Sequence, residues 1–202
     1  MKILKFNFLL ISILAIMFMV DAQAQEVYKL QSKNSKLTIE GTSSIHDWEM
    51  KAENFKAETL LQMKGEVVSE ISNVEFSTPV SGLKSGKSIM DKKAHDALKE
   101  KKSPEIKFAL NKNNNVSISG TRANFTGLLT VAGKTKEVSL SAQFDIENPQ
   151  KFLVSGSVPI KMSDFGVDPP TAMMGTIKTH DEVVVQFNLE FQKSSQEYTG
   201  NY

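Results

Sequence analysis

Alternation of apolar and polar residues is the dominant pattern of this chain. It is most regular in residues 182–191, where one face of the expected strand carries Val183, Val185, Phe187, Leu189 and Phe191. The same period of two recurs in residues 74–80, 106–110, 125–131, 138–146 and 152–162. Shorter or less regular apolar segments lie at residues 27–30, 37–39, 48–50, 55–63 and 116–118. A period of two predicts half-buried β-strands, so we expect an all-β fold.

Turn signals separate these segments and indicate antiparallel neighbours. Ala132-Gly133-Lys134-Thr135 supplies a glycine for a hairpin turn between two long segments, and Asn113-Asn114-Asn115 and Asn148-Pro149 mark two more turns. At this chain length, antiparallel strands with one apolar face form either a sandwich or a closed barrel. The length of the segments favours an extended antiparallel β-barrel.

A transmembrane barrel shows the same alternation with its apolar face turned outward, between girdles of aromatic residues. This sequence holds one tryptophan, Trp48, and three tyrosines, two of which lie in the C-terminal tail. Its phenylalanines lie in the middle of the expected strands instead. A barrel with its apolar face inward is therefore the preferred interpretation.

Residues 88–100 break the period of two and predict one short amphipathic helix, which could plug or cap one end of the barrel. One helical face carries Met90, Ala94, Ala97 and Leu98. Ser88 and Asp91 resemble a capping box at its start, the lysines after residue 98 suit the negative end of the helix dipole, and Pro104 ends it.

The connection before the last strand is long and apolar. It contains Pro169-Pro170, which cannot continue a strand ladder, and Met173-Met174, whose flexible side chains fill irregular apolar space. We expect the Phe165–Thr176 loop to line or close the mouth of the barrel.

The first 24 residues have the composition of a secretory signal peptide. Lys2 and Lys5 accompany an apolar run at residues 6–20, and Ala22 and Ala24 occupy the small-residue positions that a signal peptidase reads. We expect cleavage after Ala24 and a periplasmic protein, with an uncleaved N-terminal anchor as the alternative. One domain at residues 25–192 and a polar tail at residues 193–202 would follow.

Charge and cysteine usage exclude several classes of protein. Without residues 1–24 the chain holds 22 basic and 22 acidic residues, so it has no net field to attract nucleic acid. It contains no cysteine, and therefore no disulfide, thiolate nucleophile or cysteine-ligated metal. A nucleophile elbow, a phosphate-binding loop and a dinucleotide fingerprint are all absent from the sequence. We expect a protein without enzymatic activity and without a cofactor.

The three histidines are the remaining candidates for metal or hydrolytic chemistry. His46, His95 and His180 are each followed by aspartate, but nothing in their spacing brings them together. Unrelated polar surface or turn residues are the simpler interpretation, and a metal or hydrolytic site is the alternative. Because His46 lies beside Asp47 and Trp48, after a turn of small polar residues, we also consider a contact with a ligand headgroup at the rim.

Residues 84–107 hold eight lysines and four acidic residues. A solvent-exposed helix face is the simpler interpretation of this local excess of positive charge. The alternative is an electrostatic contact with an anionic headgroup, or a transient contact with a membrane surface.

The apolar faces of the strands carry the main functional signal, because phenylalanines fall in phase with aliphatic residues on several strands. The interior of an eight-stranded barrel is just wide enough to be filled by side chains or to hold one ligand. The pattern does not decide between a packed core and a cavity. For a cavity, the candidate ligand contacts are His46, Trp48, Phe76, Phe108, Phe125, Leu129, Leu140, Phe144, Val154, Ile160, Phe165, Met173, Met174 and Phe187.

Several motifs together resemble the YceI-like family of exported, lipocalin-like proteins. These motifs are GTSSIHDW at 41–48, IMDKKAHDAL at 89–98, SPEIKF at 103–108, GLLTVAGKTKEV at 127–138, KMSDFGV at 161–167 and MMGTI at 173–177. The resemblance covers most of the chain between Tyr28 and Gln192.

The resemblance implies a lipocalin-like extended antiparallel β-barrel around an apolar tunnel, with one short helix beside it. It implies non-enzymatic binding, transport or sequestration of a long-chain isoprenoid or a similar amphiphilic lipid. It also implies a homodimer. A structural or interaction barrel with a filled core is the alternative from a different class.

Overall fold

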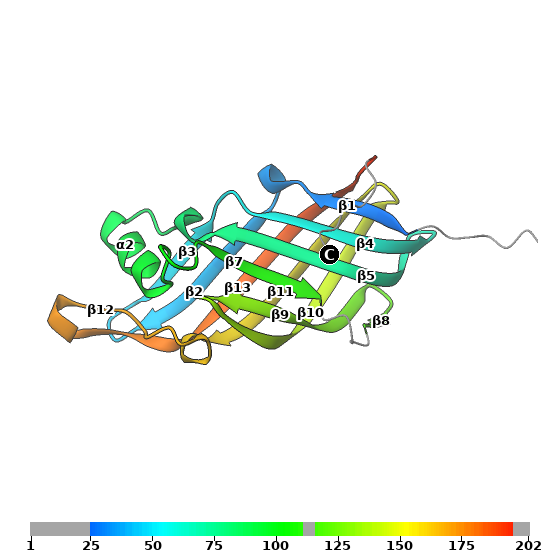
Figure 1. The fold of residues 1–202 in the computed structure, drawn as a ribbon. Helices are drawn as coiled ribbons and strands as arrows, with labels where there is room; N and C mark the ends of the chain where they lie inside the picture. The colour runs from blue at the N-terminus through cyan, green and yellow to red at the C-terminus, as the bar shows by residue number, and fades with distance from the viewer. Residues whose placement is uncertain (1–24, 111–115, 196–202) are drawn as a thin grey trace, which may run out of the picture.

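The computed structural model describes residues 25–110 and 116–195, and it shows one sheet of antiparallel strands with a short helix at one end (Figure 1). The strands are β1 Glu26–Leu30, β2 Lys36–Ser43, β3 Asp47–Ala52, β4 Lys56–Lys64, β5 Val67–Pro79, β6 Leu83–Lys84, β7 Glu105–Leu110, β8 Ser117–Ser119, β9 Arg122–Val131, β10 Lys134–Asn148, β11 Lys151–Lys161, β12 Thr171–Ala172 and β13 Ile177–Lys193. The helix is α2, Ser88–Ala97, and four 3₁₀ turns are η1 Ser32–Asn34, η2 Val80–Gly82, η3 Met162–Phe165 and η4 Met173–Gly175.

The sheet closes on itself as an eight-stranded barrel. The strand order is β1-β4-β5-β7-β9-β10-β11-β13, and β13 pairs again with β1 through Leu30 opposite Phe191. Every pairing along this path is antiparallel, as the turn signals predict. Apolar side chains of the strands point into the barrel, so the all-β fold and the inward apolar face are confirmed.

Three walls of the barrel are each built from two strands with a break between them. β1 and β2 lie end to end, because both pair with β13. In the same way β4 pairs with β1 while β3 pairs with β2, and β5 pairs with β4 while β6 pairs with β3. The breaks lie at η1, at residues 53–55 and at η2, and so they fall at neighbouring positions around the barrel. Beyond the breaks, β2, β3 and β6 extend the barrel toward the end that carries α2 (Figure 1).

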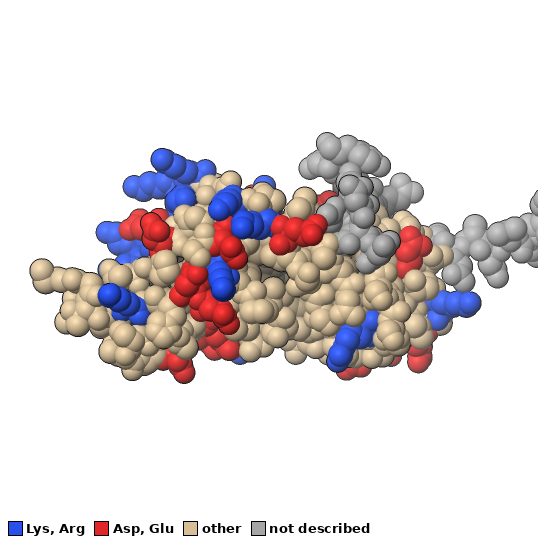
Figure 2. Space-filling view, turned by 90° about the horizontal axis from the view of Figure 1, so that it is seen from below, with Lys and Arg blue, Asp and Glu red and all other residues tan. Residues whose placement is uncertain are grey.

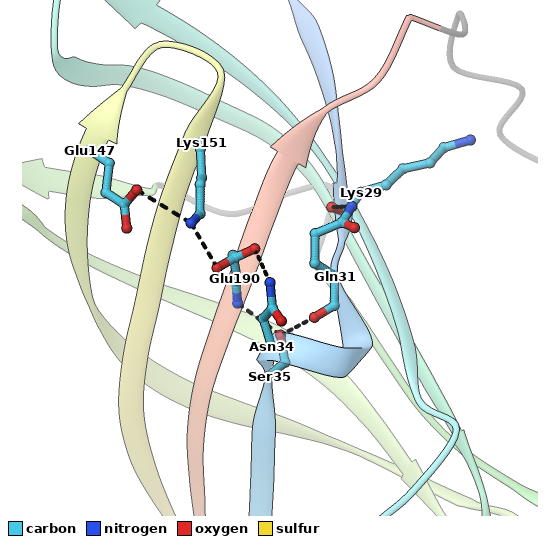
Figure 3. A network of polar contacts seen from close by, with 7 residues as sticks. All are labelled: Lys29, Gln31, Asn34, Ser35, Glu147, Lys151 and Glu190. Carbon is cyan, nitrogen blue, oxygen red and sulfur yellow. Dashed lines mark hydrogen bonds and ion pairs between the residues drawn. The ribbon is translucent and has the colours of Figure 1, made fainter.

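A polar network holds the first break in place (Figure 3). Glu190 of β13 accepts a hydrogen bond from Asn34 Nδ2 at 2.7 Å and lies 3.0 Å from Lys151 Nζ of β11. Its backbone N–H donates to Ser35 Oγ, which in turn donates to the Gln31 carbonyl. Because Asn34 and Lys151 favour the charged carboxylate, the pKa of Glu190 is lowered. The network fixes η1 against the outside of the barrel.

Two expected turns form as the sequence indicates. Ala132 and Gly133 both have positive φ, 51° and 81°, between β9 and β10, which is the geometry of a tight two-residue hairpin. At the next hairpin, the Asn148 side chain accepts a hydrogen bond from the Gln150 N–H at 2.9 Å. The expected turn at residues 113–115 and the predicted signal peptide at residues 1–24 lie outside the described residues.

The helix begins at Ser88 as predicted but ends at Ala97, three residues earlier than expected, and its N-terminus is not a capping box. Lys87 is the N-cap residue and makes no side-chain cap bond. The Asp91 carboxylate accepts hydrogen bonds from the N–H and the hydroxyl of Ser85, at 2.7 and 2.6 Å, and these bonds lower its pKa. The capping-box prediction is therefore wrong, because Lys87 is the N-cap residue and the Asp91 carboxylate bonds to Ser85.

The last strand ends close to the expected C-terminal boundary of the domain. Lys193 is the last residue of β13; its N–H donates to the Gln150 carbonyl and its ammonium pairs with Glu26. The N–H of Ser194 donates to the Val27 carbonyl. The last strand therefore ends one residue beyond the predicted domain end at residue 192, and the domain boundaries stay a prediction. Among the described residues, no helix has both the length and the hydropathy to cross a membrane.

Candidate functional site

The interior of the barrel is a cavity of about 830 Å³. Its walls are the inward faces of strands β2 to β5, β7, β9 to β11 and β13, together with one side of α2. Most of the lining side chains are aliphatic or aromatic, and several of the polar ones lie at the α2 end. Ligand pockets in proteins measure about 300–1,000 Å³, so this cavity is large enough for one extended small molecule. The alternative of a packed core is therefore wrong.

Aromatic side chains close the end of the cavity away from α2. Phe152 packs edge-on against Tyr28 at 5.0 Å, is stacked on Phe191 at 5.3 Å and lies 5.8 Å from Phe144. Tyr28 is fully buried beside this group, and its hydroxyl donates to the Pro149 carbonyl at 2.8 Å. Burial raises the pKa of the Tyr28 phenol, with a further contribution from the nearby Glu26 carboxylate. We call Tyr28, Phe144, Phe152 and Phe191 the aromatic floor.

Two glycines keep the cavity open above this floor. A Cβ placed on Gly127 would lie 2.1 Å from the ring of Phe108, and one on Gly156 would lie 2.5 Å from the ring of Phe187. The rings therefore lie against the backbone of the neighbouring strand, in space that only glycine leaves free. A side chain at either glycine would push a ring into the lumen, so the glycines create interior volume.

The loop after β11 covers part of the cavity wall through Phe165 and Val167, both buried. Asp181 of β13 anchors this loop, because its carboxylate accepts the Ser163 N–H at 2.7 Å and the Ser163 hydroxyl. These bonds lower the pKa of Asp181. Gly166 ends η3 in the left-handed conformation at φ 64°, which lets the chain turn away directly after Phe165.

Helix α2 forms one side of the mouth. Its residues Met90 and Ala94 line the cavity, although none of the ten helix residues is buried. His95 anchors the helix through a 2.9 Å bond between Nε2 and the Leu83 carbonyl. Lys93 Nζ donates to the Thr171 carbonyl at 2.6 Å, which ties the helix to the loop on the other side of the opening.

His46 and Trp48 lie at the same mouth, in and after the turn between β2 and β3. The Trp48 indole covers Gly41, where a Cβ would lie 2.2 Å from the ring, and its Nε1 donates to the Thr42 carbonyl at 3.2 Å. His46 is exposed, and its Nδ1 lies 2.8 Å from the Asp47 carbonyl. Both side chains line the opening of the cavity, so they are in place to contact a ligand headgroup.

Twelve of the fourteen predicted contact residues line the cavity. They are His46, Trp48, Phe76, Phe108, Phe125, Leu129, Leu140, Phe144, Val154, Ile160, Phe165 and Phe187.

Met173 and Met174 are the exceptions, because both side chains lie outside the lining. They are 73% and 106% exposed, and both have left-handed backbone with φ of 50° and 56°. This backbone turns the side chains toward solvent, so the expectation that they fill apolar space in the mouth is wrong. The neighbouring Pro170, Thr171 and Ala172 line the opening instead.

Sequence reasoning missed Ile45 and Ile89, which lie at the mouth and are 61% and 75% exposed. The available signal was an isoleucine in a polar turn and another at the start of the helix, each out of phase with its apolar neighbours.

The histidines occupy separate structural positions. His95 is held by Leu83 and lies 3.6 Å from Glu100, while His180 Nδ1 lies 2.8 Å from the Thr42 hydroxyl. Within residues 25–110 and 116–195, no group of three or more His, Cys, Asp or Glu side chains is arranged to hold a metal ion.

An eight-stranded antiparallel barrel around an apolar cavity, with a helix at its mouth, defines the class of lipocalin-like barrel proteins. Within that class, the chain belongs to the YceI-like domain family, whose sequence model matches residues 28–191. No curated protein matches the chain significantly by sequence.

Solved structures with this fold include three similar proteins. BcnA of Burkholderia cenocepacia has a TM-score of 0.66 and 20% identity, over 80% of this chain and 98% of that one. A polyisoprenoid-binding domain from Saccharophagus degradans, implicated in plant cell wall breakdown, has a TM-score of 0.63 and 11% identity, over 83% and 98% of the two chains. The YceI protein of Campylobacter jejuni has a TM-score of 0.57 and 18% identity, over 73% and 85%.

Proposed function

We propose that this protein binds a long-chain isoprenoid or a similar amphiphilic lipid and sequesters or carries it, without catalysing a reaction. The observation that carries the proposal is the apolar cavity of about 830 Å³, whose lining includes residues of α2 and of the β2–β3 turn at one end of the barrel. The polyisoprenoid-binding domain from Saccharophagus degradans has the same fold, which supports this ligand class.

The energetics favour a chain of hydrocarbon. Burial of about ten methylene groups gains about 8 kcal/mol gross, at about 0.8 kcal/mol each. Ordering of the chain and loss of its free motion offset a substantial part of that gain. The polar part of the lipid would lie at the mouth, where His46 and Lys87 line the opening. No polar chemistry is needed deeper in the barrel.

The cellular setting is part of the proposal. A signal peptide cleaved after Ala24 would place the protein in the periplasm, where a carrier could move lipid between membranes. The lysines of residues 84–107 would support a transient contact with a membrane. The homodimer implied by the family resemblance stays a prediction, which sedimentation equilibrium tests directly.

Lipid recovery from the native protein tests the function. Protein purified from the cell envelope is examined by native mass spectrometry and by solvent extraction, and the emptied protein is titrated with a fluorescent prenyl probe. We expect a bound lipid of discrete mass and a saturable fluorescence response. Absence of both would contradict the proposal.

A matched pair of variants assigns the probe to the cavity. Leu140→Trp fills the lumen from β10, whereas Ser141→Trp places the same ring on the outside of the same strand. We expect Leu140→Trp to weaken probe binding by about tenfold or more, equivalent to about 1.4 kcal/mol, and Ser141→Trp to leave it unchanged. Equal binding by both variants would place the probe outside the barrel.

A further inference from the structure

Exposed apolar side chains are concentrated at the open end of the barrel. Among the described residues, six large hydrophobic side chains are exposed: Ile45, Val67, Ile89, Leu128, Met173 and Met174. Four of the six lie around the mouth, on the β2–β3 turn, the first turn of α2 and η4 (Figure 1). These four, Ile45, Ile89, Met173 and Met174, are the most exposed of the set, and we call them the apolar tips.

Hydrogen bonds hold the three segments that carry the apolar tips in fixed positions. Lys93 of α2 donates to the Thr171 carbonyl at 2.6 Å, beside η4. The Ser44 N–H donates to the Lys178 carbonyl at 2.9 Å, which joins the β2–β3 turn to the start of β13. The tips are therefore parts of one rim around the opening.

The backbone at η4 is strained in a way that keeps the methionines exposed. Met173, Met174 and Gly175 have consecutive φ values of 50°, 56° and 91°. Left-handed backbone is unfavourable for a residue with a side chain, and residues strained in this way cluster at functional sites. Here two consecutive left-handed residues present two large apolar side chains to water.

Exposed lysines lie on α2 and on the segments just before and after it. Lys87, Lys92, Lys101 and Lys102 are exposed and form no ion pair with any described residue. Figure 2 shows Lys and Arg side chains interspersed with Asp and Glu side chains toward the end of the molecule that carries α2. Lysines next to exposed apolar side chains are the combination by which peripheral proteins bind anionic membranes.

We propose that the rim is a membrane-docking surface, in which the apolar tips enter the interface of an anionic bilayer while the lysines contact lipid phosphates. This proposal rests on the proposed function and extends it, because docking brings the mouth of the cavity onto the bilayer. A lipid chain can then pass into the barrel without crossing water. The open end is therefore the end through which the ligand enters.

Vesicle sedimentation tests the docking. Protein that comprises residues 25–202 is mixed with vesicles of phosphatidylglycerol and phosphatidylcholine, and separately with vesicles of phosphatidylcholine alone. We expect the protein to bind the anionic vesicles, and this binding to weaken at high salt. We expect the double change Met173→Ser and Met174→Ser to lower the partition coefficient by about tenfold. The matched control is Val67→Ser with Leu128→Ser, which removes the two exposed hydrophobic residues away from the mouth and should leave the partition coefficient unchanged.

The prenyl probe, added without vesicles, separates docking from ligand binding. The methionine variant should bind the probe as the wild type does, because neither methionine lines the cavity. Wild-type protein that binds the probe but not the anionic vesicles would overturn docking and leave the proposed function intact. Vesicle binding without probe binding would support docking and contradict the proposed function. A third outcome is that the protein self-associates, that the methionine change abolishes this self-association, and that vesicle binding is unaffected. That result would show that a second copy covers the apolar tips, and it would overturn the membrane assignment.

Discussion

The two ends of the barrel are built on opposite principles. At the closed end, the aromatic floor is buried, its rings contact one another and the Glu190 network fixes the adjacent wall. At the open end, α2 has no buried residue and the apolar tips face solvent. The closed end therefore holds the aromatic packing. The open end combines a smaller buried cluster, Leu37, Met50, Ala52, Phe55 and Leu83, with the exposed surface and the opening that a lipid-binding protein needs.

The largest expected effect comes from a change in the aromatic floor. Phe152→Ala removes the ring that contacts Tyr28, Phe144 and Phe191, and should lower the free energy of unfolding by about 3–5 kcal/mol. Met174→Ala at the open end should change it by less than about 0.5 kcal/mol, because the side chain has no packing to lose. Urea unfolding of both variants measures the difference. Similar losses in the free energy of unfolding for the two variants would contradict the distinction between the closed and the open end.

The Glu190 network predicts a pH-dependent contribution to stability. The pKa of Glu190 is lowered in the folded state by Asn34 and Lys151, so its contribution is complete above the unfolded pKa of about 4.3 and is lost as pH falls through the lower folded pKa. Glu190→Gln should therefore be less stable than the wild type at pH 7, and the difference should shrink below about pH 4.

Urea midpoints at pH 7, 5 and 3 measure this trend. Glu182→Gln is the matched control, because Glu182 is an exposed residue of the same strand. A deficit for Glu190→Gln that is equal at all three pH values would show that the carboxylate charge is not what stabilises the network.

Two buried threonines, one hydrogen-bonded and one not, should differ in how much their hydroxyl groups contribute to the free energy of unfolding. Thr59 donates to the Asn73 carbonyl at 2.7 Å, whereas the Thr78 hydroxyl has no partner among the described residues. Thr59→Val should cost about 1–2 kcal/mol, and Thr78→Val should be neutral or stabilising by up to about 1 kcal/mol. Thermal unfolding of the two variants checks the sign. A clear loss for Thr78→Val would mean that its hydroxyl is satisfied in solution.

Most of the barrel follows from the alternation of the sequence, because a period of two fixes which residues face inward. In three strands the side chains that line the lumen are the ones that the alternation predicts. These strand segments are Phe125–Val131, Phe152–Ile160 and Val183–Phe191. The first half of β5, residues 67–73, was not predicted. Register shifts between β4 and β5, at Leu60/Leu61 and Gln62/Met63, interrupt the alternation there.

The cavity could not be predicted from the pattern alone. Whether Phe108 and Phe187 fill the lumen or lie on its wall depends on their contact with Gly127 and Gly156 across the strands, and periodicity does not contain that information. Met173 and Met174 were placed wrongly for a related reason. Their apolar character is visible in the sequence, but the left-handed backbone that turns them outward is not.

Trp48 provides the most direct test of the central claim that a lipid lies in the barrel with its polar group at the open end. It is the only tryptophan of the chain and it lines the mouth, so its fluorescence reports on that position without mutation. The probes are two long-chain alcohols, one brominated beside the hydroxyl and the other at the far end of the chain. We predict that both bind and that bromine beside the hydroxyl quenches Trp48 more strongly. Stronger quenching by the far-end bromine, or no quenching by either bound alcohol, would contradict the account.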